Sequence, residues 1–145
     1  LKPEMSAKKV TDELVQAIQG GNFDTIICNY ANGDMVGHTG KLGPAIKAVE
    51  TLDECLRRLE QAIESVQGHM LVTADHGNVE QMRDANSAQE HTAHTSNLVP
   101  LVYVGVQDLT LRPGGSLCDV APTLLDLMQM ETPPQMTGQT LIRSA

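Results

Sequence analysis

The chain has 145 residues, of which 41% are hydrophobic, so residues 1–145 are long enough for a single domain with a buried core and too short for two. Eighteen acidic residues against ten basic ones give a formal charge of -8, and no basic cluster exceeds a pair. This acidity argues against nucleic acid or an anionic membrane as a partner. A small phosphorylated substrate stays open, because metal ions can balance its charge.

The cysteine content and the length of the apolar runs indicate the cellular compartment in which the protein is expected. Cys28, Cys55 and Cys118 are odd in number and form no C-x-x-C motif, so the sequence indicates neither a disulfide framework nor a thiolate zinc site. No apolar run approaches the roughly 18 residues of a membrane span. We therefore expect a cytoplasmic protein. Because the chain does not begin with methionine, we also expect it to be part of a longer protein.

The first half of the chain predicts alternating helices and strands. A helix is expected from the N-cap Ser6 to about Gln19, followed by a strand at Asp24–Tyr30 that is apolar on both faces. Apolar residues at steps of three and four from Ile46 to Val66 predict an amphipathic helix, and Met70–Val72 predicts the next strand. Strand, crossover helix and strand make a right-handed βαβ unit in a parallel sheet.

The second half predicts a loop, a strand and a helix. Residues 79–97 are polar and are interpreted as an active-site loop. Leu98–Val104 predicts another strand, and Asp119 is expected to be the N-cap of a helix with Pro122 in its first turn. The pattern as a whole predicts the α/β class.

Carboxylates and imidazoles gather where the predicted strands end. Asp34 and His38 follow the first strand at i, i+4, and Asp75 and His76 follow the second. A pair of histidines, His91 and His94, precedes the third strand. Parallel strands end at one edge of a sheet, so these segments are expected to meet there. Mixed imidazole and carboxylate ligands suit zinc, manganese or iron better than calcium.

Each pair taken singly has a simpler explanation, namely a surface carboxylate beside a polar loop histidine. Only the three segments together favour a metal site, and the fifth histidine, His69, is interpreted as a helix-to-strand turn residue. Two metal ions about 3.5–4 Å apart would act as a clamp on a transferring phosphoryl group.

The three motifs, in this order and spacing, resemble a known family. Asn-Gly-Asp34-Met-Val-Gly-His38-Thr-Gly, Thr-Ala-Asp75-His76-Gly-Asn and His91-Thr-Ala-His94-Thr are similar to the C-terminal part of the cofactor-independent (2,3-bisphosphoglycerate-independent) phosphoglycerate mutases. The segment from Asp119 to Leu125 resembles one shared across the wider alkaline phosphatase superfamily. The resemblance implies a three-layer α/β/α sandwich with a mostly parallel sheet, which would be incomplete in this chain.

The resemblance also implies roles for individual residues. Asp34, His38 and His94 match the protein ligands of one metal ion, usually manganese, with zinc or another divalent ion as the alternative; His91 is the second choice for the third ligand. Asp75 and His76 match two ligands of a second metal ion. The family's nucleophilic serine and the remaining ligands have no counterpart in this sequence, so no catalytic residue is assigned.

The implied reaction is the interconversion of 3-phosphoglycerate and 2-phosphoglycerate through a phosphoserine. Without that serine and the substrate domain, the isolated chain is expected to be inactive. Two alternatives are another phosphotransferase or phosphodiesterase of the alkaline phosphatase superfamily, and a metal-binding module without catalysis. The full-length enzyme is expected to be monomeric, whereas this chain is expected to self-associate through an exposed strand edge.

Overall fold

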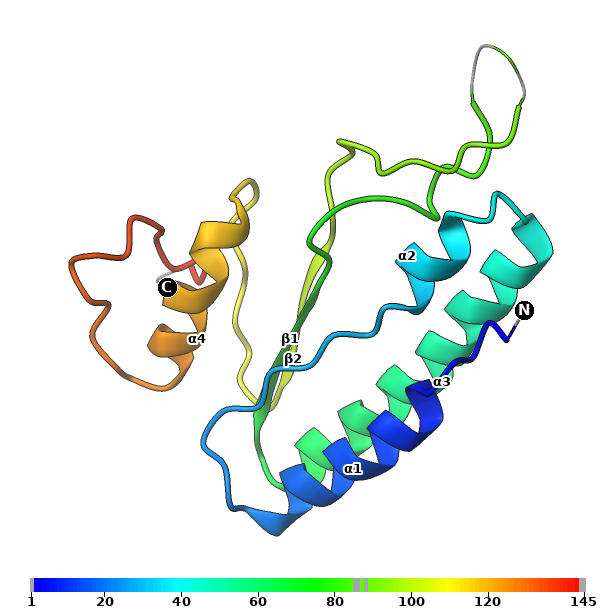
Figure 1. The fold of residues 1–145 in the computed structure, drawn as a ribbon. Coiled ribbons are helices and arrows are strands. Elements are labelled where there is room, and N and C mark those ends of the chain that lie inside the picture. Colours follow the sequence, from blue (N-terminus) through cyan, green and yellow to red (C-terminus); the bar gives the residue numbers. More distant parts are fainter. Residues whose placement is uncertain (1, 85–86, 88, 144–145) are drawn as a thin grey trace.

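The computed structural model describes residues 2–84, 87 and 89–143 (Figure 1). Helices, strands and one 3-10 turn (η1) follow in the order α1 (Ala7–Gly20), α2 (Asn32–Gly37), α3 (Leu42–Ser65), β1 (His69–Thr73), β2 (Leu101–Gly105), η1 (Leu117–Asp119) and α4 (Val120–Leu127). Among these residues, no helix has the length and apolar character needed to cross a bilayer.

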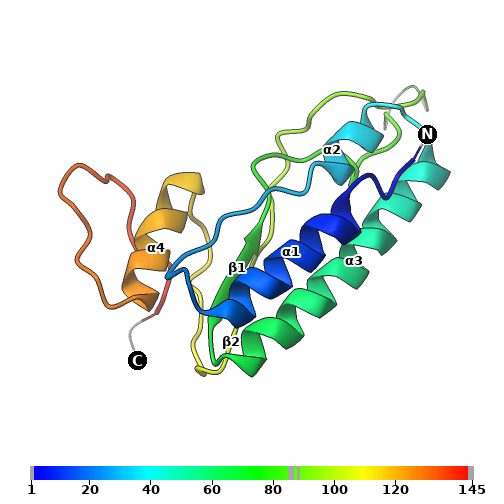
Figure 2. The same cartoon turned by 60° about the horizontal axis from the view of Figure 1, so that its bottom comes forward.

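The helices α1 and α3 lie side by side and run in the same direction (Figures 1 and 2). The buried face of α3 is made mainly of small residues at steps of three and four, among them Ala48, Cys55 and Ala62. The apolar positions Ile46 and Val49, which contribute to the pattern predicting this helix, are instead 50% and 48% exposed. Small side chains let the neighbouring elements approach closely, and Leu59, which is 6% exposed, is the large apolar side chain buried on this face.

The sheet has two strands, and they pair antiparallel. His69 of β1 lies opposite Gly105 of β2, and Thr73 lies opposite Leu101. In both views these strands lie between α1 and α3 on one side and α4 on the other (Figures 1 and 2). The α/β class and the layered arrangement agree with the incomplete sandwich that the sequence predicts, but the pairing among the described residues is antiparallel rather than parallel.

The predicted strand at Asp24–Tyr30 is wrong for this chain. The segment forms no ladder with any described residue, and Ile27 is 87% exposed. A strand needs a partner strand for its backbone groups, and no described residue pairs with this segment. Its end is anchored through a 2.7 Å hydrogen bond between the hydroxyls of Tyr30 and Thr11. The parallel βαβ unit is therefore absent from the described residues, although α3 and β1 are present as predicted.

Asp119 is the N-cap residue of α4, as predicted, but its side chain makes its hydrogen bonds elsewhere. Its carboxylate accepts hydrogen bonds from the backbone N–H of Ser116 at 2.9 Å and of Gln139 at 2.8 Å, and it makes no capping bond to α4 itself. These two bonds hold the pKa of Asp119 below its ordinary value. Nearby, the Thr123 hydroxyl accepts from the backbone N–H of Leu141 at 2.9 Å. Both side chains fasten the C-terminal segment onto α4.

A small apolar cluster fixes α2 on α3. It consists of Val36, Ala45, Ala48 and Met82, with the partly buried Val79 against it. Val36 is 2% exposed, whereas its neighbour Met35 is 56% exposed. The short helix α2 cannot be stable by itself, so this packing determines where its polar residues lie.

We expect Val36→Ala to lower the free energy of unfolding by about 2 kcal/mol, because two buried methyl groups are removed from this cluster. Urea denaturation followed by circular dichroism measures the change. Met35→Ala is the matched control in the same helix, and it should change the value by less than about 0.5 kcal/mol. Equal losses for the two variants would contradict this description of the core.

Candidate metal centre

Asp34 lies in the short helix α2, and His38 is the C-cap residue directly after it. Their i, i+4 spacing brings His38 Nε2 to 3.1 Å from Asp34 Oδ1. The other ring nitrogen, Nδ1, lies 2.6 Å from the carbonyl oxygen of Thr92. A carbonyl oxygen only accepts, so Nδ1 carries a proton, and in the neutral ring the lone pair of Nε2 faces Asp34.

His94 completes a triangle of electron-pair donors. Its Nε2 lies 2.8 Å from Asp34 Oδ1 and 3.1 Å from His38 Nε2. Atoms that bind one ion at about 2.1 Å lie about 3.0–3.4 Å apart, which is close to these separations. One proton can satisfy two of the three contacts, whereas a divalent cation satisfies all of them. The donor set therefore fits a metal ion.

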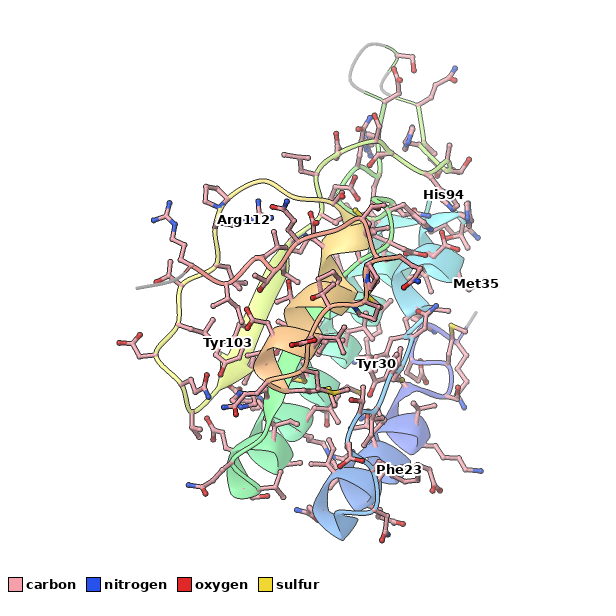
Figure 3. The ribbon with its side chains drawn as sticks, turned by 90° about the vertical axis from the view of Figure 1, so that its left-hand side faces the viewer. Phe23, Tyr30, Met35, His94, Tyr103 and Arg112 are labelled. Atoms are coloured by element: carbon pink, nitrogen blue, oxygen red, sulfur yellow. The ribbon has the colours of Figure 1, made fainter. Side chains whose placement is uncertain are left out.

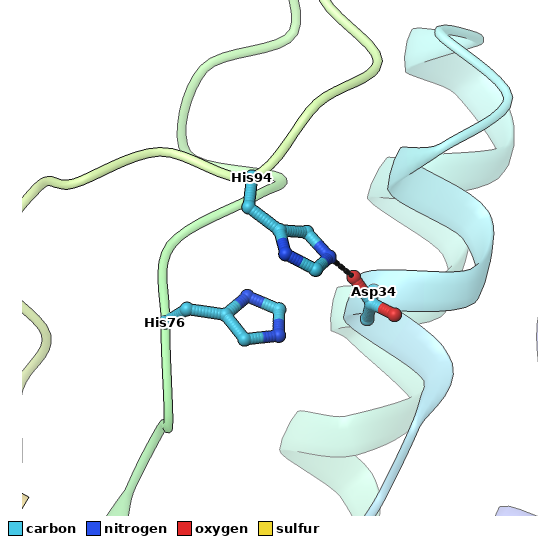
Figure 4. A group of neighbouring side chains, drawn as sticks. All are labelled: Asp34, His76 and His94. Atoms are coloured by element: carbon cyan, nitrogen blue, oxygen red, sulfur yellow. Dashed lines mark hydrogen bonds and ion pairs between the residues drawn. The ribbon is translucent and has the colours of Figure 1, made fainter.

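His76 stacks on His94 and extends the cluster. The two rings are 3.7 Å apart at their centroids and 22° from parallel. Figure 4 shows His76 beside the pair formed by His94 and Asp34. One ligand atom from each of these three residues lies within 4.8 Å of the other two. Nδ1 of His76 is 3.2 Å from the carbonyl oxygen of Gly77, an arrangement that leaves Nε2 available as a ligand.

Two further candidate residues lie outside this cluster. Asp75 is beside His76, at 3.7 Å, but its side chain is 75% exposed and does not join the group. Nε2 of His91 is enclosed without a hydrogen-bond partner among the described residues, and His91 is not in the group either. In Figure 3 His94 lies near Met35 of α2, while Phe23 is at the opposite end of the molecule. The geometry favours His94 over His91.

The surroundings of Asp34 stabilise its ionised form. Partial burial alone would raise the pKa of this carboxyl, but a hydrogen bond from the Asn78 amide and the nearby His38 and His94 rings outweigh it and lower the pKa below the ordinary 3.8. The stability gained from the ionised group is thus present above the unfolded-state pKa and is lost as the pH falls through the lower folded-state value. At neutral pH Asp34 is a carboxylate that can bind a cation.

Asn78 is a site residue that sequence reasoning missed. It is 6% exposed, and its Nδ2 donates to Asp34 Oδ1 at 2.8 Å. Asn78 also packs closely against the backbone of Gly37: a Cβ added to Gly37 would lie 2.6 Å from Cγ of Asn78. The only signal in the sequence was an amide directly after the Asp75-His76-Gly77 turn, and that pattern is common in turns of no special function.

Residues 1–132 match the family model of the Metalloenzyme superfamily, and the chain belongs to that family.

Two similar relatives have the same name. The chain is 58% identical over 142 residues to a 2,3-bisphosphoglycerate-independent phosphoglycerate mutase of Hahella chejuensis, and 59% identical over 141 residues to one of Salmonella typhi. These matches include 98% and 97% of this chain but only 27% of the length of each relative. The recognition of this family from the three motifs is confirmed, and the chain spans about a quarter of the length of these relatives.

A solved structure has the same fold. The phosphoglycerate mutase of Leishmania mexicana, whose crystal structures were determined at low cobalt concentration, matches with a TM-score of 0.89 and 34% sequence identity. The match covers 99% of this chain and 29% of that protein. The predicted fold class, an incomplete alkaline-phosphatase-like sandwich, agrees with this match.

The contact of Gly37 with Asn78 yields a test of the site's packing. In Gly37→Ala the new methyl group would collide with the Asn78 amide and lie 3.0 Å from Cγ1 of Val79, so we expect the free energy of unfolding to fall by about 1–3 kcal/mol. Urea denaturation measures it. Gly43→Ala is the matched helical control, because nothing lies within 4 Å of its added Cβ. A Gly37→Ala protein as stable as the Gly43→Ala protein would refute this close approach.

Proposed function

We propose that Asp34, His38 and His94 bind one divalent metal ion, with manganese as the first candidate and zinc as the alternative. The observation that carries this proposal is the triangle of their ligand atoms, whose sides are 2.8 Å, 3.1 Å and 3.1 Å. Membership in the Metalloenzyme superfamily supports it. His76 and Asp75 are the proposed ligands of a second metal ion.

The chemistry of such a centre suits phosphoryl transfer. Bound metal ions would neutralise the charge on the oxygens of a transferring phosphoryl group. The chain's own residues supply fixed, correctly protonated ligands: the Thr92 carbonyl orients the His38 ring, and the Asn78 amide orients the Asp34 carboxylate. The net charge of -8 provides little else to attract an anionic substrate, so the metal ions would have to do so.

The proposed reaction is the interconversion of 3-phosphoglycerate and 2-phosphoglycerate in a longer cytoplasmic protein of which this chain forms part. The names of the 58% and 59% identical relatives support this choice of substrate. The two alternatives are another phosphotransferase or phosphodiesterase of the alkaline phosphatase superfamily, and a metal-binding module without catalysis. We keep the prediction that the longer enzyme is monomeric and that the isolated chain self-associates.

We expect manganese to raise the melting temperature of the purified chain at neutral pH, because a ligand that binds only the folded state stabilises it by about 2.7 kcal/mol at 100 times its Kd. His38→Ala should abolish this shift. His69→Gln should keep it, since His69 hydrogen-bonds to Tyr103 on the sheet, away from the cluster. The shift should shrink as the pH is lowered, because imidazoles bind metal only when neutral. A shift that survives in His38→Ala would refute the proposed site.

We expect the 145-residue chain by itself not to interconvert 3-phosphoglycerate and 2-phosphoglycerate with manganese present, because transfer through a phosphoserine requires a nucleophile that no residue here is assigned to supply. A coupled assay with enolase measures the reaction. Turnover that Asp75→Ala abolishes would contradict the predicted inactivity and would also assign Asp75 to the active centre.

A further inference from the structure

Glu80 lies between the two loops that carry His76 and His94. One carboxylate oxygen, Oε2, accepts a hydrogen bond from the backbone N–H of Asn78 at 2.5 Å. The other, Oε1, accepts from the Asn97 amide at 3.0 Å and from the Thr95 hydroxyl. A single side chain therefore contacts both loops.

The groups that Glu80 contacts are next to the proposed ligands. Asn78 is two residues after His76, and Thr95 directly follows His94. The same loops also meet through the backbone, where the N–H of Thr95 donates to the carbonyl of Gly77 at 2.9 Å. A displacement of Glu80 would therefore change the separation of the two histidine rings.

The network continues to the third ligand segment. Asn78, whose backbone Glu80 holds, donates from its side chain to Asp34 Oδ1 at 2.8 Å. Gly77 has no room for a side chain, because an added Cβ would collide with the Thr95 hydroxyl and with the Glu80 carboxylate. Three chain segments that are distant in sequence are thus connected to one carboxylate.

Glu80 is engaged by these donors rather than directed at the metal centre. Both of its oxygens accept hydrogen bonds from the loops, one from Asn78 and the other from Asn97. Its pKa lies below the ordinary value, with the hydrogen bond from the Thr95 hydroxyl as the largest cause, so both oxygens act as acceptors at neutral pH.

We propose that Glu80 is a positioning residue for the metal centre: it sets the relative placement of His76 and His94 and, through Asn78, of Asp34. This inference rests on the proposed metal site. Glu80 acts through Asn78, which hydrogen-bonds the proposed ligand Asp34, and partners of that kind typically change metal affinity by 10–100-fold when they are mutated. Nothing in the sequence pattern distinguishes Glu80 from an ordinary exposed loop glutamate.

The test is a titration of the apo chain with cobalt(II), followed by visible absorption, because the d–d spectrum reports both affinity and coordination geometry. In Glu80→Gln the amide nitrogen would face a donor in place of an oxygen, at nearly unchanged side-chain volume. We expect about tenfold or greater loss of affinity and an altered spectrum. The control is Glu54→Gln, whose exposed carboxylate pairs with Lys8 on α1. It should match the wild type in both respects.

A second variant separates positioning from general destabilisation. Titrations are done well below the melting temperature of each variant, with the folded fraction checked by circular dichroism. Thr95→Val removes one donor to Glu80 and should weaken binding less than Glu80→Gln does. The double variant should bind about as weakly as Glu80→Gln alone, because the two residues act through one contact.

The outcomes distinguish this inference from the proposed function. If the wild-type chain does not bind cobalt(II), the proposed metal centre is wrong, and the role of Glu80 with it. If the wild type binds while folded Glu80→Gln has the same affinity and the same spectrum, the metal centre stands and the positioning role is overturned. Fully additive losses in the double variant would also overturn it.

Discussion

The Asp34 carboxylate is the point on which the site depends. Through Oδ1 it contacts His38 at the end of its own helix, His94 from the loop before β2 and Asn78 from the loop after β1. Each contact involves a different segment, so a shift of α2 would separate the ligands from one another. The position of α2 is fixed in turn by Val36, which lies in the small core against α3. A helix of six residues thus has one side in the core and another in the proposed metal centre.

The antiparallel sheet explains why His76 and His94 meet. In an antiparallel pair, the end of one strand lies beside the beginning of the other. Thr73, the last residue of β1, is opposite Leu101, the first residue of β2. The chain that leaves β1 towards His76 therefore runs beside the chain that arrives from His94, and the bridge between Gly77 and Thr95 continues this approach. Glu80 then contacts both sides of the approach.

The sequence was sufficient to predict the helices and strands that depend on residues close together in the chain. The long helix α3 and the strand β1 both agree with the structure. Asp34 and His38 are spaced i, i+4, and in the structure their side chains meet. Here spacing along the chain determines the geometry, so a pattern of side chains was enough.

What the sequence could not predict depends on partners distant in the chain. The apolar run at Asp24–Tyr30 has the composition of a strand but no described neighbour to pair with. Asp119 is the N-cap residue of α4 as predicted, but its carboxylate accepts hydrogen bonds from Ser116 and Gln139, which lie outside that helix. Asn78 and Glu80 acquire their roles only through contacts across loops, which no periodicity reveals.

Crystals of the chain grown with manganese, measured at the manganese absorption edge, would test the metal centre most directly. We predict an anomalous peak about 2.1 Å from each of Asp34 Oδ1, His38 Nε2 and His94 Nε2, the distance expected for nitrogen and oxygen ligands. A saturated crystal with no peak between these three atoms, or with its strongest peak elsewhere, would contradict the proposed site.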